Sequence, residues 1–126
     1  MSKYVLDASA ILALLNQEPG KEQVAALLPQ SLVSAVNVAE VLSRLVDAGM
    51  PIDTAAESLD LLRLEILDFT KPLAVRAASL RQATRKRGLS LGDRCCLALG
   101  IESGSEVVTA EKDWDRLKLC PVTTIR

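Results

Sequence analysis

Histidine is absent from the 126 residues of this chain. Its absence excludes Ser-His-Asp triads, Cys-His pairs, histidine-dependent RNA cleavage and histidine-ligated zinc sites. Any chemistry must therefore use carboxylates, hydroxyls, thiols, lysine or arginine. Aromatic residues are also scarce, with one Trp, one Tyr and one Phe, so the sequence lacks a platform on which RNA bases could stack.

An excess of basic charge is lacking as well, since the formal net charge is −1. Proteins that bind nucleic acid mainly through surface charge usually carry a basic face. A nucleic-acid role would therefore need a local basic patch, a metal ion or a basic partner. The three cysteines, Cys95, Cys96 and Cys120, have no C-x-x-C spacing and are expected to be reduced, buried thiols.

Targeting and membrane signals are not visible in the sequence. The apolar run from Val5 to Leu15 contains Asp7 and is too short to span a bilayer. No signal peptide precedes it. Together with the cysteine pattern, this predicts a cytoplasmic protein that does not enter a membrane.

Short apolar runs alternate with amphipathic segments along the chain, and hydrophobic residues make up 49% of it. A single domain over residues 1–126 is expected. Strands are expected at residues 4–7, 31–34, 65–69, 106–109 and 121–125, the last at a sheet edge. Helices are expected at residues 8–16, 20–28, 36–49, 53–64, 72–87 and 90–103, and a further short helix is expected to end at residue 119. The alternation predicts an α/β fold, a parallel sheet with helices on both faces.

Acidic residues occupy positions that such a fold brings together. Asp7 and Thr109 stand at the ends of expected strands, and Glu40 and Asp93 in the first turns of expected helices. In open parallel sheets the functional site lies outside the carboxyl ends of the strands. We therefore expect these side chains to share one rim of the sheet.

Each acid also has a purely structural explanation. A carboxylate at Asp7 could cap the following helix. Asn37 with Glu40, and Ser90 with Asp93, fit the pattern of a capping box, and Glu40 could also pair with Arg44 one turn later. Asp7 is the hardest to explain in this way, because it ends an apolar strand and has no basic residue near it in sequence.

The functional interpretation is that the carboxylates share a pocket. Negative charges a few Å apart repel each other, and a divalent cation removes that conflict. Oxygen ligands favour Mg²⁺, with Mn²⁺ as a substitute, over Zn²⁺. Such a metal lowers the pKa of bound water and stabilises charge on a phosphoryl oxygen, which suits hydrolysis of a phosphodiester. Thr109 and Ser9 could offer hydroxyl groups to a ligand water or phosphate, and one or two metals are both compatible.

Four segments resemble the PIN domain and, more closely, the VapC-type toxins of bacterial type II toxin–antitoxin pairs. They are VLDASA at 5–10, VNVAEVL at 36–42, LSLGDRCCLAL at 89–99 and VVTAEKDW at 107–114. The resemblance covers the whole chain in order and spacing. It implies a PIN-like (Rossmann-like) fold, Mg²⁺- or Mn²⁺-dependent endoribonuclease activity, homodimers, and a cognate antitoxin that blocks the site.

By this resemblance, Asp7, Glu40 and Asp93 match the first three acids of the family. The fourth acid of the family is usually Asp, two residues after the threonine, where this chain has Glu111. Asp113 is the other candidate for that role. The departure also leaves open an inactive relative that only binds RNA or protein.

The basic run of Arg85, Lys86 and Arg87 could contact RNA phosphates, or could be a solvated helix end favoured by the helix dipole. Arg94 could contact phosphate or the antitoxin, or pair with a surface acid such as Glu102. Apolar helix surface at 53–64 and 74–80 is expected to contribute to a homodimer or an antitoxin groove.

Other α/β families fit the end of the first strand poorly. A phospho-acceptor receiver domain needs an acidic pair there, yet Asp7 is followed by Ala8. A haloacid-dehalogenase-type phosphatase needs D-x-D, yet the third residue is Ser9. A dinucleotide-binding protein needs a glycine-rich first turn, which the sequence lacks.

Overall fold

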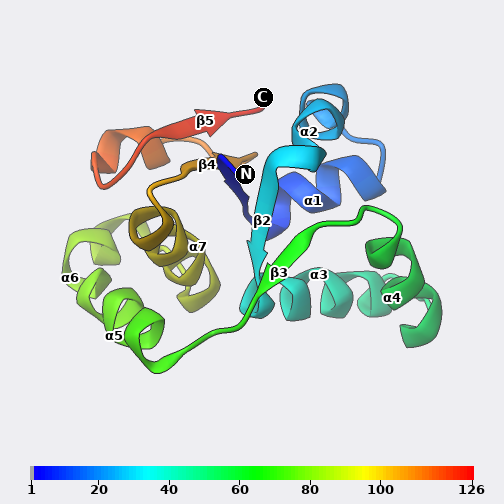
Figure 1. Cartoon of the computed structure of the whole chain (residues 1–126), viewed down its shortest axis with the longest axis horizontal. Helices are drawn as coiled ribbons and strands as arrows, with labels where there is room; N and C mark the ends of the chain where they lie inside the picture. The colour runs from blue at the N-terminus through cyan, green and yellow to red at the C-terminus, as the bar shows by residue number, and fades with distance from the viewer. Residues whose placement is uncertain (1) are drawn as a thin grey trace.

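Five short strands form one parallel sheet in the order β3-β2-β1-β4-β5 (Figure 1). The structure, a computed structural model, describes residues 2–126. The strands are β1 (Tyr4–Leu6), β2 (Ser31–Ser34), β3 (Glu65–Leu67), β4 (Glu106–Thr109) and β5 (Val122–Thr124). The expected parallel α/β sheet is confirmed, and β5 lies at its edge as predicted.

Adjacent residues of the central strands pack on opposite faces of the sheet, because successive side chains of a strand alternate. One buried cluster contains Val5, Leu32 and Val107, and the other contains Leu6, Val33 and Val108. Both faces therefore need cover, which explains why these strands read as continuous apolar runs in the sequence.

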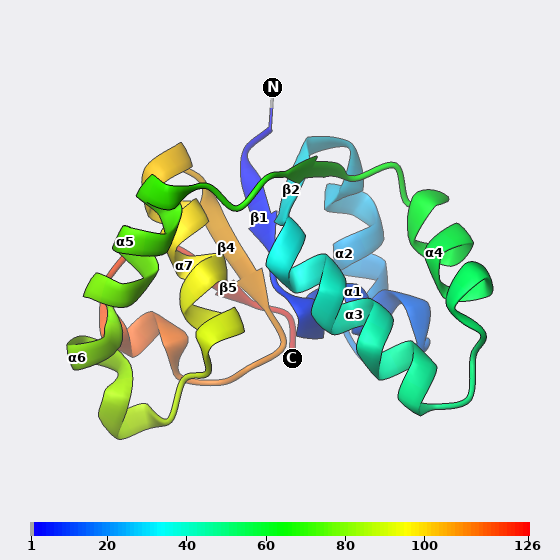
Figure 2. The same cartoon turned by 90° about the horizontal axis from the view of Figure 1, so that it is seen from below.

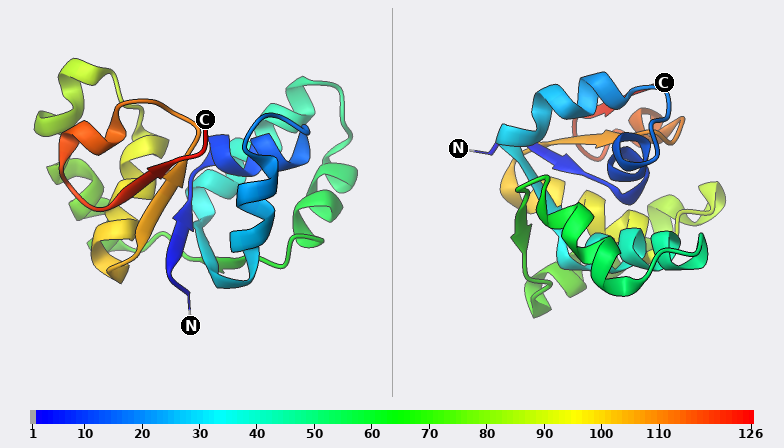
Figure 3. Two further views of the ribbon diagram at one scale, coloured as in Figure 1. Left: turned by 90° about the horizontal axis from the view of Figure 1, so that it is seen from above. Right: turned by 90° about the vertical axis from the view of Figure 1, so that its right-hand side faces the viewer.

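Helices supply that cover on each side. One group is α1 (Ala8–Leu15), α2 (Lys21–Leu27), α3 (Ala35–Asp47) and α4 (Ile52–Asp60), and the other is α5 (Lys71–Ser79), α6 (Arg81–Thr84) and α7 (Leu91–Ser103). Figure 2 shows the strands between these two groups, and Figure 3 shows the same division from above. Within residues 2–126 no helix is long and apolar enough to cross a membrane.

Two expected helices differ from the prediction. The helix expected over 72–87 is divided into α5, α6 and a 3-10 turn, η2 (Arg85–Arg87). At the break, the Thr84 hydroxyl donates to the Leu80 carbonyl at 2.8 Å, and such side-chain bonds compete with the regular helical ladder. The last expected helix is only the 3-10 turn η3 (Trp114–Leu117), since Asp113 and Lys118 on either side have positive φ angles of 75° and 54°.

The order of the strands locates the site. From β1 the sheet grows through β2 to β3 on one side, and then through β4 to β5 on the other. The connections therefore diverge between β1 and β4, and open α/β sheets bind ligands at such a point, outside the strand carboxyl ends. Asp7 follows β1 and Thr109 ends β4, and the Asp7 N–H donates to the Val108 carbonyl at 3.1 Å.

Candidate active site

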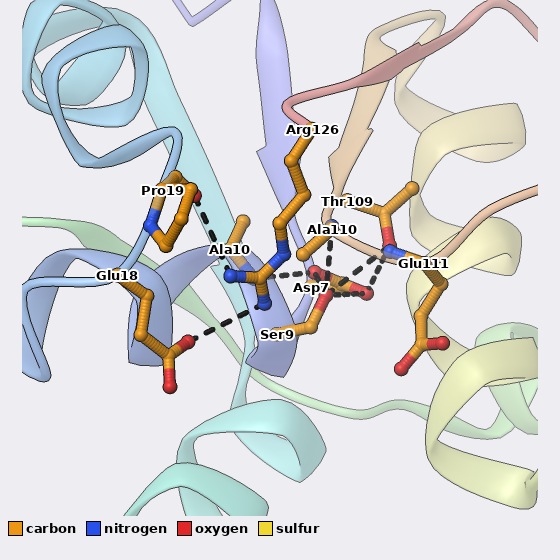
Figure 4. A network of polar contacts seen from close by, with 9 residues as sticks. All are labelled: Asp7, Ser9, Ala10, Glu18, Pro19, Thr109, Ala110, Glu111 and Arg126. Atoms are coloured by element: carbon orange, nitrogen blue, oxygen red, sulfur yellow. Dashed lines mark hydrogen bonds and ion pairs between the residues drawn. The ribbon is translucent and has the colours of Figure 1, made fainter.

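Asp7 is a buried carboxylate surrounded by hydrogen-bond donors, with only 3% of the residue exposed. Its Oδ1 accepts the Ala10 N–H at 2.8 Å, so it caps α1 as expected. The Thr109 hydroxyl donates to Oδ2 at 2.6 Å. The Ser9 hydroxyl lies 2.8 Å from both carboxylate oxygens (Figure 4). The cap does not exhaust the role of Asp7, because a cap alone does not require burial.

The two hydroxyl groups beside Asp7 are themselves held by backbone donors. The Glu111 N–H donates to Thr109 Oγ1 and the Ala110 N–H donates to Ser9 Oγ, each at 2.9 Å (Figure 4). Thr109 is fully buried, and its hydroxyl faces Asp7. Thr109 therefore supports the carboxylate directly.

The surroundings of Asp7 change its acidity. Burial raises the pKa of Asp7 from 3.8 to about 6, and the negative charge of Asp93 adds to the rise. The hydrogen bonds from Thr109, Ala10 and Ser9 lower the pKa but only in part. At neutral pH the metal-free protein therefore carries a buried negative charge, and this charge lowers the stability of the folded state.

We expect Asp7→Asn to stabilise the metal-free protein at neutral pH. Because the folded pKa of about 6 lies above the ordinary value of 3.8, ionisation of Asp7 costs no stability below about pH 4, and the cost grows as the pH rises through 6. The loss by pH 7.5 is about 3 kcal/mol. Asparagine is neutral throughout and keeps a capping oxygen.

Urea unfolding in EDTA at pH 3.5 and pH 7.5 measures this effect. The variant should exceed the wild type clearly at pH 7.5 and only slightly at pH 3.5. A stability difference that is the same at both pH values would contradict the prediction.

Glu40 is held by Asn37, a residue that the sequence predicts to be a helix cap. Helix α3 begins directly after its N-cap, Ser34, so Glu40 lies in the second turn and the expected Asn37 capping box does not form. Instead, Asn37 Nδ2 donates to Glu40 Oε1 at 2.6 Å and to the Gly92 carbonyl at 3.1 Å. The expected ion pair between Glu40 and Arg44 is not found within residues 2–126.

Gly92, in the first turn of α7, makes room for the Glu40 carboxylate. A Cβ at residue 92 would lie 2.1 Å from Glu40 Oε1 and 2.5 Å from its carboxyl carbon. Asn37, which is 1% exposed, and Gly92 thus fix this carboxylate between α3 and α7. Sequence reasoning missed both roles, and the available signal was a glycine directly before a candidate acid.

Asp93 forms the capping box that its sequence predicts. Its N–H donates to Ser90 Oγ at 3.1 Å, and the Ser90 N–H donates to Asp93 Oδ2 at 2.9 Å. The cap uses Oδ2, so Oδ1 is free to bind a ligand. For Asp93, as for Asp7, the structural role and a functional role are compatible.

The candidate acids line one small cavity at the carboxyl ends of β1 and β4. Its volume is about 50 Å³, and its lining comprises Asp7, Glu40, Asp93 and Glu111 together with Ala8, Ser9, Leu12 and Arg44. Asp113 is not part of this lining. It is exposed and pairs with Arg116 at 3.4 Å. Of the two candidates for the fourth acid, the structure brings Glu111 to the other three.

The profile of the PIN domain matches residues 4–119 of the sequence. The chain belongs to the PIN domain family. Comparison with curated proteins gives no significant match. The family expected from the four sequence segments is thus confirmed.

Solved structures with the same fold cover nearly the whole chain. A DNA-bound VapBC complex from Salmonella typhimurium has a chain with 19% identity, a TM-score of 0.78 and 100% coverage of both chains. A toxin–antitoxin complex from Klebsiella pneumoniae gives 21%, 0.76 and 98% of both chains. FitAcB from Neisseria gonorrhoeae gives 24%, 0.72 and 97% of both chains.

The oxygen-rich lining of this PIN domain suits a hard divalent cation. Within residues 2–126, no group of three or more acidic, histidine or cysteine side chains is already arranged to hold a metal ion. Thiols are not alternative ligands, because none of the three cysteines lines the acidic cavity. Burial raises the pKa of Cys96 well above its ordinary value and also raises that of Cys95. Both are buried free cysteines as expected, whereas Cys120 is only half-buried.

The basic run of Arg85, Lys86 and Arg87 is only partly directed toward the acids. Lys86 and Arg87 line a larger cavity of about 550 Å³ that also includes Asp93 and Glu111, whereas Arg85 is exposed outside it. The first two therefore lie beside the acids, as a role in phosphate contact requires.

Arg94 does not form the expected ion pair with Glu102. Its guanidinium donates to the Ala77 carbonyl at 3.1 Å and so turns toward α5. The acid proposed as its partner, Glu102, instead pairs with Arg76 at 2.6 Å. The side chain of Arg94 ties α7 to α5, on which Ala77 is buried.

Proposed function

We propose that this PIN domain is a metal-dependent endoribonuclease and the toxin of a type II toxin–antitoxin system. The observation that carries the proposal is the convergence of Asp7, Glu40, Asp93 and Glu111 on one cavity. They come from the start of α1, from α3, from α7 and from the segment after β4. Four carboxylates around a small cavity repel each other unless a cation joins them.

We propose Mg²⁺, with Mn²⁺ as a substitute, as the cation that these four acids hold. When bound, the cation would lower the pKa of a coordinated water and would stabilise negative charge on a phosphoryl oxygen. The chain itself orients the ligands. Donors from Ser9, Ala10 and Thr109 fix Asp7, and Asn37 fixes Glu40.

The proposed partners are a cognate antitoxin and a second copy of this chain, with which it would form a homodimer. Support comes from the similar solved structures, which are themselves VapBC and other toxin–antitoxin complexes. An apolar groove of about 390 Å³ also lies between α3 and α4, where Val46 and Ile52 are 42% and 56% exposed. Leu61, directly after α4, is 81% exposed. Of these residues, Leu61 lies within the segment 53–64 where an apolar interface is expected, and the groove lies just before that segment in sequence.

Removing divalent metal is expected to stop RNA cleavage completely. The purified protein should cleave a structured RNA in Mg²⁺ or Mn²⁺, lose activity in EDTA and regain it when either metal is restored, because the clustered carboxylates need a cation before they approach a phosphate. Gel analysis of an end-labelled transcript gives the measurement.

Cleavage that continues undiminished in EDTA would contradict the metal mechanism. If the wild type cleaves no RNA with either metal, the alternative of a non-catalytic PIN module that only binds RNA or protein is favoured.

A further inference from the structure

Three cavities adjoin one another at the acids through shared lining residues, and together they are called the groove. The 50 Å³ acidic cavity shares Asp93 and Glu111 with the 550 Å³ cavity on one side. It shares Ser9, Leu12, Arg44 and Glu111 with a 340 Å³ cavity on the other side. Glu111 lines all three. The acids therefore lie at the middle of the groove, not at its end.

Cations line the groove on both sides of the acids. One side has Lys86, Arg87 and Lys112. The other side has Arg44 and Arg126. Arg44 is exposed and forms no ion pair in the part of the chain that the structure describes, so its charge is available to a ligand.

Arg126 reaches the groove because the chain returns from β5 to the start of α1 (Figure 3). Its guanidinium pairs with Glu18 at 3.3 Å and donates to the Pro19 carbonyl at 3.5 Å. Figure 4 shows this side chain extended toward α1, with its guanidinium near Ser9. Ser9 and Arg126 both line the 340 Å³ cavity. Glu18 thus orients a partly exposed cation beside the acids.

The dimensions and composition of the groove favour a single RNA strand held by its phosphates. The middle cavity, at about 50 Å³, has room for little more than one or two waters, so no base pair enters it. Trp114 lines the 550 Å³ cavity but is buried, and Tyr4 and Phe69 line none of the three cavities, so within residues 2–126 the groove has no exposed aromatic face for base stacking. Arginine binds phosphate oxygens through two parallel N–H donors.

Building on the ribonuclease function proposed above, we propose that Arg44 and Arg126 form a phosphate subsite for single-stranded RNA. It lies on the side of the acids opposite Lys86, Arg87 and Lys112. The RNA backbone then contacts cations on both sides of the bond that is cut. An interior segment of a strand satisfies this arrangement, whereas a strand end reaches only one side.

The test measures binding of a fluorescein-labelled 12-nucleotide single-stranded RNA by anisotropy over a salt series. Arg44→Gln, Arg126→Gln and the double variant are made in full-length Asp7→Asn protein, so that the RNA is not cut. Each phosphate contact on a single strand contributes about 0.7 to the slope of log K against log salt. The double variant should therefore lower the slope by about 1.4 and weaken binding about tenfold or more at low salt.

Two control variants separate this subsite from general charge. Arg63→Gln removes an exposed charge between α4 and β3, outside the groove, and should keep the slope. Arg44→Lys keeps the charge and should keep most of the slope, and thermal melting checks each fold. An unchanged slope in the double variant would overturn the subsite while metal-dependent cleavage by the wild type still supports the proposed function. A wild type that cleaves no RNA, together with a lowered slope in the double variant, would overturn the proposed function but keep the phosphate subsite.

Discussion

Asp7→Asn is expected to reduce metal-dependent RNA cleavage by well over 100-fold while the protein stays folded. Groups that merely orient a metal ligand typically contribute about 10- to 100-fold to metal affinity or activity, and Asp7 is proposed as a ligand itself. Asparagine keeps the oxygen that caps α1 but removes the negative charge that a cation requires. Initial rates on a labelled transcript, measured over a range of Mg²⁺ concentrations, give the result.

The matched control is Asp113→Asn, which makes the same chemical change at an exposed acid. Asp113 lies outside the acidic cavity, although it lines the neighbouring 550 Å³ cavity, and it pairs with Arg116, so this variant should keep most of the wild-type rate. Activity that survives in Asp7→Asn would refute the proposed mechanism. An equal loss in Asp113→Asn would refute the choice of Glu111 as the fourth acid.

Gly92→Ala is expected to lower cleavage by about 10- to 100-fold, although it adds only one methyl group. The added Cβ would lie 2.1 Å from Glu40 Oε1. The Glu40 carboxylate is the flexible end of its side chain, so the carboxylate moves and the backbone does not. Alanine is also the better helix former, by about 1 kcal/mol. The melting temperature should therefore be maintained while activity falls.

A double variant shows whether crowding of Glu40 causes that loss. Glu40→Asp shortens the side chain, so adding it to Gly92→Ala should cost less than the product of the two separate effects, as expected for residues in contact. Full activity in Gly92→Ala would show that the position of the Glu40 carboxylate is unimportant. A large fall in its melting temperature would show that Gly92 serves the fold alone.

The sequence was sufficient to predict the strands and the acids, because both depend on local patterns. Apolar runs such as residues 31–34 can be buried only in a covered sheet. Asp7, at the end of such a run, had no local partner for its charge. Asp7, Glu40 and Asp93 were therefore found from their places at strand ends and helix starts, whereas Glu111 was identified only through the resemblance to the PIN domain.

The errors arise where a distant contact decides the position of a side chain. Asn37 looked like a cap, but its amide bonds Glu40 and the carbonyl of Gly92, a residue 55 positions away. Arg94 lies next to Asp93 in sequence, yet it turns toward Ala77. Spacing along the chain carries no information on either contact, since each depends on how α7 packs against other helices.

Two of the four acids lie in the first half of the chain and two in the second half, so the ribosome makes them at different times. Asp7 and Glu40 precede the middle of the sequence, whereas Asp93 and Glu111 follow it. On the ribosome, where folding proceeds from the N-terminus, a growing chain holds only half of the set until α7 and β4 have emerged and β4 has paired with β1. The proposed ribonuclease site is therefore incomplete in a growing chain until both Asp93 and Glu111 have left the ribosome.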